Sequence, residues 1–233
     1  MFVLEKGKVE GGRSALFLHA LGLDHGMWLP QLEELSDSCL LLAVDLPGFA
    51  RSRSEQPGLR GAAESCAAIL RERELRPVVV GVSYGGYVAT VLAATHPGLV
   101  SGLAISGVRT RVPAGAAYLQ AALFRLVRPR SLARGVSVPA EALVAERKNL
   151  ISASRELATV DLAPLLPLVT APTIVFAPER DRFVRRGVPD LAAAMSAARV
   201  VPLADAGHLW TQTQARPLVD AIHELLPRAS SDL

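Results

Sequence analysis

The chain of 233 residues has little of the material that defines several classes of protein. Its cysteines are Cys39 and Cys66, too few for a disulfide framework, and we expect both to be buried free thiols. No run of about 18 residues is uninterrupted by charge or proline, and the N-terminal residues lack the long apolar core of a signal peptide. These absences predict a cytoplasmic protein with no membrane association.

Concentrated charge and ligand clusters are also missing. The formal net charge is +3 and the basic residues are scattered, so we expect no nucleic-acid partner. The sequence shows no metal-ligand cluster and no dinucleotide fingerprint. The glycine-containing segment 81–86 lacks the lysine of a phosphate-binding loop. The sequence therefore predicts no metal and no cofactor, a small molecule as the partner, and nothing about the oligomeric state.

The chain does have a regular alternation of short apolar runs and helical patterns, and half of its residues are hydrophobic. Continuous apolar runs are typical of strands buried in a parallel sheet. The segments between them carry apolar residues at helical spacing. This predicts an α/β fold with a mostly parallel central sheet and helices on both faces. The expected strands are 2–9, 14–20, 39–44, 78–81, 103–106, 173–176 and 199–203, and the expected core helices are 28–35, 61–76, 84–96, 188–198 and 213–226.

Residues 108–165 interrupt this alternation, because they show helical patterns and prolines but no strand pattern. A long excursion at one sheet connection is more often functional than structureless. We therefore expect a helical lid (cap) at 108–165, inserted into a core formed by 1–107 and 166–233, with a helical decoration that has no role in substrate choice as the alternative. The three helical patterns cover 114–128, 139–153 and 154–162.

The most informative motif is Gly81-Val82-Ser83-Tyr84-Gly85, which stands between a β-branched run and an apolar helical pattern. Small residues at 81 and 85 let the chain turn sharply, so that Ser83 is held in a strained conformation above the sheet edge. There its hydroxyl is exposed, and the following helix points its N-terminus at the reacting oxygen. This context predicts a nucleophile elbow with Ser83 as the catalytic serine.

Three further motifs occur in order with this one. Residues 18–22 read LHALG, residues 45–52 read DLPGFARS, and residues 206–208 read AGH. They are similar to the oxyanion loop, the D-x-x-G-x-G-x-S turn and the C-terminal G-H of the α/β-hydrolase superfamily, with Ala20 and Ala50 where that family has glycine. Over nearly its whole length the chain thus resembles this superfamily, in its serine carboxylesterase and enol-lactonase-like branch. The resemblance implies an α/β-hydrolase fold with a catalytic triad.

The serine needs a base, because a hydroxyl is a weak nucleophile at neutral pH until an imidazole takes its proton. His208 follows a predicted strand, in a glycine-containing loop at the side of the sheet that holds Ser83. We expect His208 to be the general base, with His25 as the second candidate. The resemblance gives His19 a structural role in the oxyanion loop.

The base in turn needs a carboxylate that fixes its tautomer and stabilises the imidazolium. In this family the acid lies between the nucleophile and the histidine in chain order. Asp181 follows the predicted strand 173–176 in a segment similar to the family's G-x-x-D-x-x-V, and we expect it to be the acid. Glu179 lies two residues earlier, and we expect Asp205 to form a turn beside His208.

The remaining site residues rest mainly on the resemblance. It implies an oxyanion hole made by the backbone N–H groups of Leu21 and Tyr84. We expect the side chain of Tyr84 to form a pocket wall. Core packing is the alternative for the two tryptophans in the set. The residues expected to line the substrate pocket are Trp28, Tyr118, Leu119, Leu123 and Trp210.

The predicted function is hydrolysis of a small carboxylic ester through an acyl-enzyme, since a serine at the elbow points to acyl transfer. A lactone or C–C bond hydrolase is the first alternative, because residues 21–28 are similar to the oxyanion-loop region of 3-oxoadipate enol-lactonases. A cofactor-free synthase of the same fold and a non-catalytic hydrolase-fold binding protein are the others. The apolar residues of 114–127 favour a neutral acyl group, whereas a carboxylate clamp could use Arg109, Arg111, Arg125, Arg128, Arg130 and Arg134.

Overall fold

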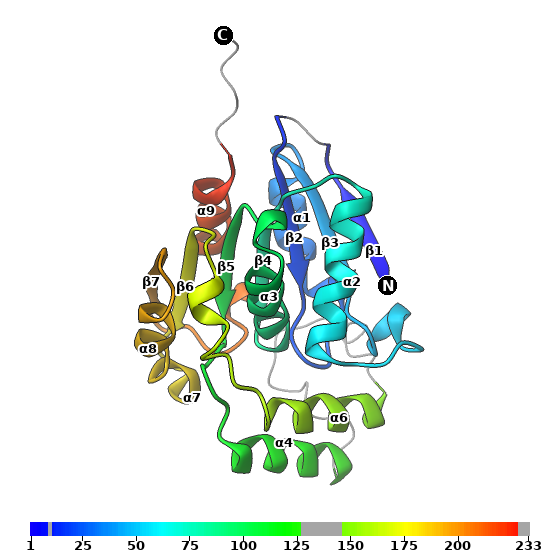
Figure 1. Ribbon diagram of the computed structural model, residues 1–233, viewed down its shortest axis with the longest axis vertical. Coiled ribbons are helices and arrows are strands. Elements are labelled where there is room, and N and C mark those ends of the chain that lie inside the picture. The colour runs from blue at the N-terminus through cyan, green and yellow to red at the C-terminus, as the bar shows by residue number, and fades with distance from the viewer. Residues whose placement is uncertain (9–10, 127–145, 228–233) are drawn as a thin grey trace.

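The computed structural model describes residues 1–8, 11–126 and 146–227, which form a layered α/β structure (Figure 1). Its centre is a seven-stranded sheet in the order β1-β3-β2-β4-β5-β6-β7. β1 pairs antiparallel with β3, and the other neighbouring strands pair in parallel, as the apolar runs predicted. The strands are β1 (Phe2–Lys6), β2 (Ser14–Leu18), β3 (Leu40–Asp45), β4 (Val78–Val82), β5 (Gly102–Ser106), β6 (Thr173–Pro178) and β7 (Ala198–Leu203).

Helices cover both faces of the sheet, and each face has its own apolar core. Successive side chains of a strand point to opposite faces, so on β2 Leu16 belongs to one core cluster and Phe17 to the other. The Leu16 face is covered by α2 (Leu59–Glu72), α3 (Tyr84–Thr95) and α8 (Val188–Ala193). The Phe17 face is covered by α1 (Leu29–Leu35) and α9 (Arg216–Leu225).

Each core cluster contains one of the two cysteines. Cys66 lies on α2 in the Leu16 cluster, and Cys39 lies just before β3 in the Phe17 cluster. Both thiols are buried and free, which confirms the prediction from the sequence. Of the helices in the described part of the chain, none is both long enough and apolar enough to span a membrane.

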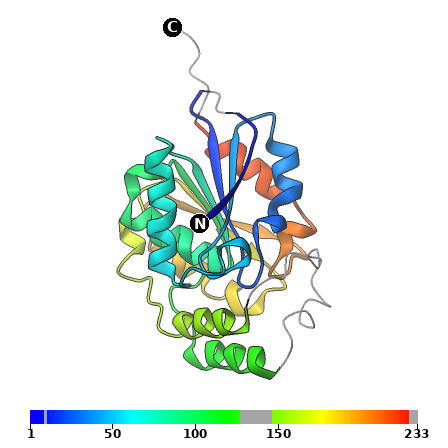
Figure 2. The same cartoon turned by 90° about the vertical axis from the view of Figure 1, so that its right-hand side faces the viewer.

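Two helices from the connection between β5 and β6 lie against each other beyond the carboxyl ends of the parallel strands (Figures 1 and 2). They are α4 (Ala114–Leu126) and α6 (Arg147–Leu157). The predicted helix boundary after residue 153 is wrong, because α6 continues through it. Its buried residues recur at helical spacing, and no proline or glycine interrupts them. Residues 127–145, over which parts of two helices were predicted, lie outside the described residues.

Candidate active site

Ser83 occupies the turn between β4 and α3, in a backbone conformation that is uncommon for a residue with a side chain. Its φ is 55° and its ψ is −120°. Its N–H donates to the carbonyl of Ser106 at the end of β5, at 2.8 Å, so the strained turn is tied to the neighbouring strand. Backbone strain of this kind costs about 1–3 kcal/mol and concentrates at functional sites.

The glycines around Ser83 are required by close contacts. A Cβ on Gly81 would lie 2.4 Å from the carbonyl oxygen of Gly85, and one on Gly85 would lie 2.1 Å from that of Leu18. Gly107, with φ of +75°, lies under the site, and a Cβ there would come within 3.1 Å of both Cα of Ser83 and Cε1 of His208. Gly81 and Gly85 therefore let the chain turn at Ser83, and Gly107 leaves room for Ser83 and His208 to lie close together.

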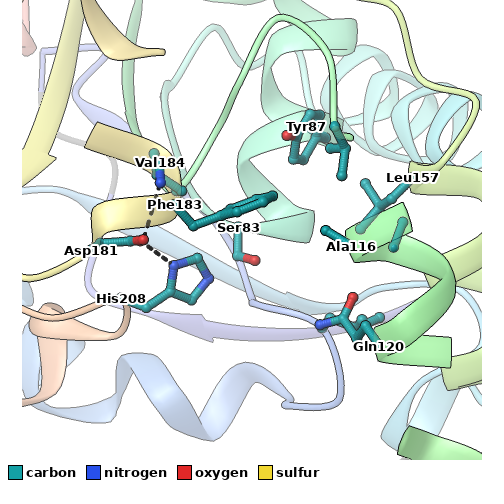
Figure 3. A pocket seen from close by; sticks show the side chains of 13 residues that line it. Ser83, Tyr87, Ala116, Gln120, Leu157, Asp181, Phe183, Val184 and His208 are labelled. Carbon is teal, nitrogen blue, oxygen red and sulfur yellow. Dashed lines mark hydrogen bonds and ion pairs between the residues drawn. The ribbon is translucent and has the colours of Figure 1, made fainter. Parts of the chain in front are cut away.

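Asp181 and His208 form a short hydrogen bond beside the serine (Figure 3). Asp181 follows β6 and caps α7 (Arg182–Arg185), accepting a hydrogen bond from the N–H of Val184 at 3.2 Å. Its other carboxylate oxygen lies 2.5 Å from Nδ1 of His208, which follows β7. A carboxylate there holds a proton on Nδ1 and leaves Nε2 free to accept one.

The surroundings of Asp181 keep it ionised. Burial alone would raise the pKa of its carboxyl group. The hydrogen bond and charge of His208 outweigh that effect, together with hydrogen bonds from the N–H groups of Val184 and Phe183, and hold the pKa below its ordinary value. An anionic Asp181 can therefore stabilise a protonated imidazole at neutral pH.

Ser83, Asp181 and His208 share the wall of one cavity of about 340 Å³ (Figure 3). The hydrogen bonds of the described residues do not include one between the Ser83 hydroxyl and the imidazole. Such contacts are often loose until a substrate is bound. The other lining residues are Leu21, Tyr87, Gly107, Val112, Ala116, Ala117, Gln120, Leu157, Phe183 and Val184.

The residues expected to form the oxyanion hole lie beside Ser83. Tyr84 is the first residue of α3, where a helix leaves its N–H groups without intrahelical acceptors, and Leu21 lines the cavity. The expectation that the side chain of Tyr84 forms a pocket wall is wrong. That side chain is fully buried, and its hydroxyl donates to Glu156 on α6 at 3.3 Å.

The tryptophans predicted to line the pocket lie in the core instead. Trp28 is fully buried, with its ring 5.4 Å from that of Phe17. The ring centres of Trp210 and Phe176 are 4.6 Å apart, and the indole N–H of Trp210 donates to the hydroxyl of Ser106 at 2.9 Å. Both residues are near the site in sequence, but their large apolar surfaces are buried on the face of the sheet covered by α1 and α9.

On α4 the structure turns a different face to the cavity from the one we predicted. Tyr118, Leu119 and Leu123 are 53%, 62% and 43% exposed and do not line the cavity. The lining residues are the smaller Ala116, Ala117 and Gln120, because α4 packs closely on α6. Tyr87 and Phe183 were not predicted. The signal that could have found them is their position in the sequence: Tyr87 lies one helical turn after Ser83, and Phe183 lies two residues after Asp181.

The rival histidines have other partners. Nδ1 of His25 lies 2.7 Å from Asp45. His19 accepts from the N–H of Leu46 through Nε2 and donates to the carbonyl of Ala20 through Nδ1, each at 2.9 Å. Burial lowers the pKa of His19 to about 4, so this histidine is a neutral structural group.

Asp205 and one cluster of ligand-type residues in the described part of the chain also have partners of their own. Asp205 pairs with Arg180 at the surface, at 2.7 Å. Ligand atoms of Asp24, His25 and Asp45 lie within 4.8 Å of one another. Hydrogen bonds already engage all three: Asp24 accepts from the N–H of Gly26, and Asp45 binds both His25 and the N–H of Arg51. These contacts make the cluster a structural hydrogen-bond network.

Comparisons with known proteins agree with this architecture. The profile of a family described as "Alpha/beta hydrolase family" matches residues 15–221. The enol-lactonase from Burkholderia xenovorans LB400 superposes with a TM-score of 0.84 at 20% identity, over 96% of this chain and 95% of that one. A thermophilic esterase from Thermogutta terrifontis superposes with a TM-score of 0.81 at 25% identity, over 96% of this chain and 91% of that one. An esterase from Exiguobacterium antarcticum superposes with a TM-score of 0.84 at 16% identity, over 96% of this chain and 94% of that one.

Proposed function

The chain belongs to the alpha/beta hydrolase family, and from that premise we propose that it is a serine hydrolase that cleaves small, neutral carboxylic esters. One observation carries the proposal. Ser83 after β4, Asp181 after β6 and His208 after β7 meet at the wall of one cavity, with a short hydrogen bond between the acid and the imidazole. This is the constellation that acyl transfer through a serine needs.

The first half-reaction makes the acyl-enzyme. Nε2 of His208 takes the hydroxyl proton of Ser83 while Oγ attacks the carbonyl carbon of the ester, and Asp181 stabilises the imidazolium. The carbonyl oxygen becomes negative and accepts hydrogen bonds from the N–H groups of Leu21 and Tyr84. The bond to the alcohol oxygen then breaks, the alcohol leaves with the proton from Nε2, and the acyl group stays on Ser83.

The second half-reaction regenerates the enzyme. His208 takes a proton from a water molecule, and the water oxygen attacks the acyl carbon. The bond between that carbon and Oγ breaks, Ser83 recovers its proton from His208, and the carboxylic acid leaves. No metal or cofactor takes part in any of these steps.

The chemistry of the cavity wall supports a neutral substrate. Apart from Asp181 and His208, the described lining residues carry no charge. Arg111, which could have clamped a carboxylate, is paired with Asp161 at 2.6 Å. Arg125 is exposed on α4. The esterase that is 25% identical supports ester hydrolysis as the reaction. Of the other arginines considered for a clamp, Arg128, Arg130 and Arg134 lie outside the described residues.

We assign the lid role to the connection between β5 and β6, residues 108–165. Its described part supplies Val112, three residues of α4 and Leu157 of α6 to the cavity wall. The core supplies the three reacting side chains. On this division, the core carries the chemistry, and the lid and the core together form the wall that selects the substrate.

Ser83→Ala tests the proposal. This variant should lose at least about 10⁴-fold in kcat/KM on p-nitrophenyl acetate and butyrate, because the covalent step depends on Oγ. Its melting temperature should stay close to that of the parent. A fluorophosphonate probe should label the parent at Ser83, located by peptide mapping. Ser54→Ala, which changes an exposed serine, is the matched control and should behave like the parent.

Several outcomes would replace the proposal. Labelling at another residue would reassign the nucleophile. A strong preference for dicarboxylate lactones that weakens with salt would favour a lactonase. Labelling of Ser83 without turnover of any ester or lactone would favour a synthase. The absence of both labelling and turnover would favour a binding protein.

A further inference from the structure

Arg109 links the two aromatic side chains of the cavity wall. It follows β5, and its backbone N–H donates to the hydroxyl of Tyr87 at 3.0 Å. Its guanidinium donates to the carbonyl oxygen of Phe183 and lies over the Phe183 ring, 5.0 Å from the ring centre. One residue therefore ties the helix after the nucleophile to the loop that carries Asp181.

The ring of Phe183 lies on the cavity side of this contact. Phe183 belongs to α7, two residues after Asp181, and its ring points into the cavity in Figure 3. The side chain is 44% exposed, although it is large and apolar. A large apolar ring left open to a cavity beside a reacting serine is positioned to contact whatever binds there.

The guanidinium of Arg109 packs against a face of the same ring. Arg109 does not line the cavity, whereas Phe183 does. An aromatic ring attracts a cation to its face, and the hydrogen bond to the Phe183 carbonyl holds the guanidinium there. A molecule in the cavity therefore meets an apolar ring instead of a positive charge.

We propose that Phe183 determines specificity in two ways: it limits the length of the substrate, and it shields the cavity from the charge of Arg109. This inference rests on the proposed ester hydrolysis and deepens it, because it names the residue that excludes long and anionic substrates. Removing the ring extends the cavity toward the guanidinium. The enzyme then accepts longer esters, and it also accepts esters with a carboxylate at the far end.

The experiment compares Phe183→Ala with the parent on two kinds of substrate. The first kind tests length, with p-nitrophenyl esters of increasing acyl length and alkyl acetates of increasing alcohol length. In at least one series, kcat/KM of Phe183→Ala should rise relative to its value on the shortest member by about fourfold for each added methylene. This factor corresponds to the free energy of burying one methylene. The other is a pair, a butyrate ester and the corresponding hemisuccinate. The ratio of kcat/KM for the hemisuccinate to that for the butyrate should rise about tenfold, and this gain should fall with added salt.

A double variant separates length from charge. Phe183→Ala combined with Arg109→Met should keep the gain for longer esters and lose the gain for the hemisuccinate. Arg111→Met removes a neighbouring arginine that pairs with Asp161 outside the cavity, so it is the matched control and should keep both profiles of the parent. Phe183→Leu replaces Phe183→Ala if the alanine variant does not fold.

The outcomes distinguish this inference from the proposed function. If the parent neither hydrolyses esters nor reacts with the fluorophosphonate, the proposed function is wrong, and the inference is wrong with it. If the parent does both but the variants at Phe183 keep its length and charge profiles, the inference alone is overturned. A charge gain that survives Arg109→Met would also overturn the shielding role.

Discussion

The two helices between β5 and β6 lie side by side but are attached to the core differently. α6 is held by polar side chains. Asn149 donates to the carbonyl of Gly48 at 2.7 Å, and Glu156 accepts from the N–H of Leu59 at 2.8 Å and from the hydroxyl of Tyr84. Through Glu156, α6 is tied to the start of α2 and to the residue that follows Ser83.

α4 has a thinner attachment. Its buried residues are Ala117 and Ala121, which offer little surface to bury. Phe124 is partly buried against the core, but Tyr118, Leu119, Leu123 and Leu126 are exposed, Leu126 by 83%. The comparison indicates that α6 behaves as part of the core, whereas α4 is a wall whose position depends on α6. Changes on α6 should therefore act on stability, and changes on the outer face of α4 should act on neither stability nor chemistry.

The largest effect should come from a residue on neither helix. Asp181→Asn should lower kcat by about 10³–10⁴-fold, because an amide does not hold the imidazole in the required tautomer. KM should change little, since α4 and α6 still shape the cavity. Asp205→Asn, which breaks only a surface ion pair, should cost far less. If Asp205→Asn were the more damaging change, the acid would have to be reassigned to Asp205.

Acid should weaken the folded core through His19. His19 is neutral with a pKa of about 4 in the folded protein, against an ordinary value of 6.5. The unfolded chain therefore binds a proton first, and the free energy of unfolding should fall as pH drops from 6.5 to about 4, by roughly 3 kcal/mol. Asp181, whose pKa is lowered, adds its own loss only below its ordinary value of 3.8.

Urea unfolding at several pH values between 4 and 7 measures this effect. His19→Gln keeps an acceptor for the N–H of Leu46 but has no titrating ring. The variant should show a flatter dependence of stability on pH across this range. Equal slopes for the variant and the parent would mean that another group controls the acid limit.

The next effect tests the attachment of α6. Asn149→Ala removes a buried amide and leaves the carbonyl of Gly48 without this partner, which should lower the free energy of unfolding by about 1–3 kcal/mol. Lys148→Ala, on the exposed face of the same helix, is the control and should change it by less than about 0.5 kcal/mol. If both variants were as stable as the parent, α6 would not belong to the folded core.

The smallest effect should come from the outer face of α4. Leu119→Ser and Tyr118→Ser should each change the free energy of unfolding by less than about 0.5 kcal/mol, because more than half of each residue is exposed to solvent. Values of kcat/KM on short esters should also stay at the level of the parent. A loss of more than about 1 kcal/mol in either variant would show that this face is covered in solution and would remove the contrast with α6.

The sequence predicted the parts of the fold that depend on local patterns. Continuous apolar runs located the strands, and Gly81 and Gly85 located the turn that carries Ser83, because no larger residue fits there. Asp181 and His208 remain predicted as catalytic residues, now with a hydrogen bond between them. Their positions could be predicted because both follow strands that end at the edge of the sheet holding Ser83.

The cavity wall could not be predicted in the same way. Which face of α4 meets the cavity depends on how α6 packs against it, and that contact joins segments about 30 residues apart. Trp28 and Trp210 were misplaced for a related reason, since closeness in sequence to the site does not decide which face of the sheet takes a large ring. Phe183 was missed because an aromatic residue beside a catalytic acid has no distinctive pattern.

The division of the core into two layers gives each layer its own built-in chemical reporter. Burial raises the pKa of Cys66 to about 12 and also raises the pKa of Cys39, so in the folded protein neither thiol is available to an alkylating reagent as a thiolate. Alkylation must wait until the surrounding layer opens. The rate of modification at Cys66 then measures opening under α2, and the rate at Cys39 measures opening under α1, so mass spectrometry could show whether the two sides of the sheet unfold together.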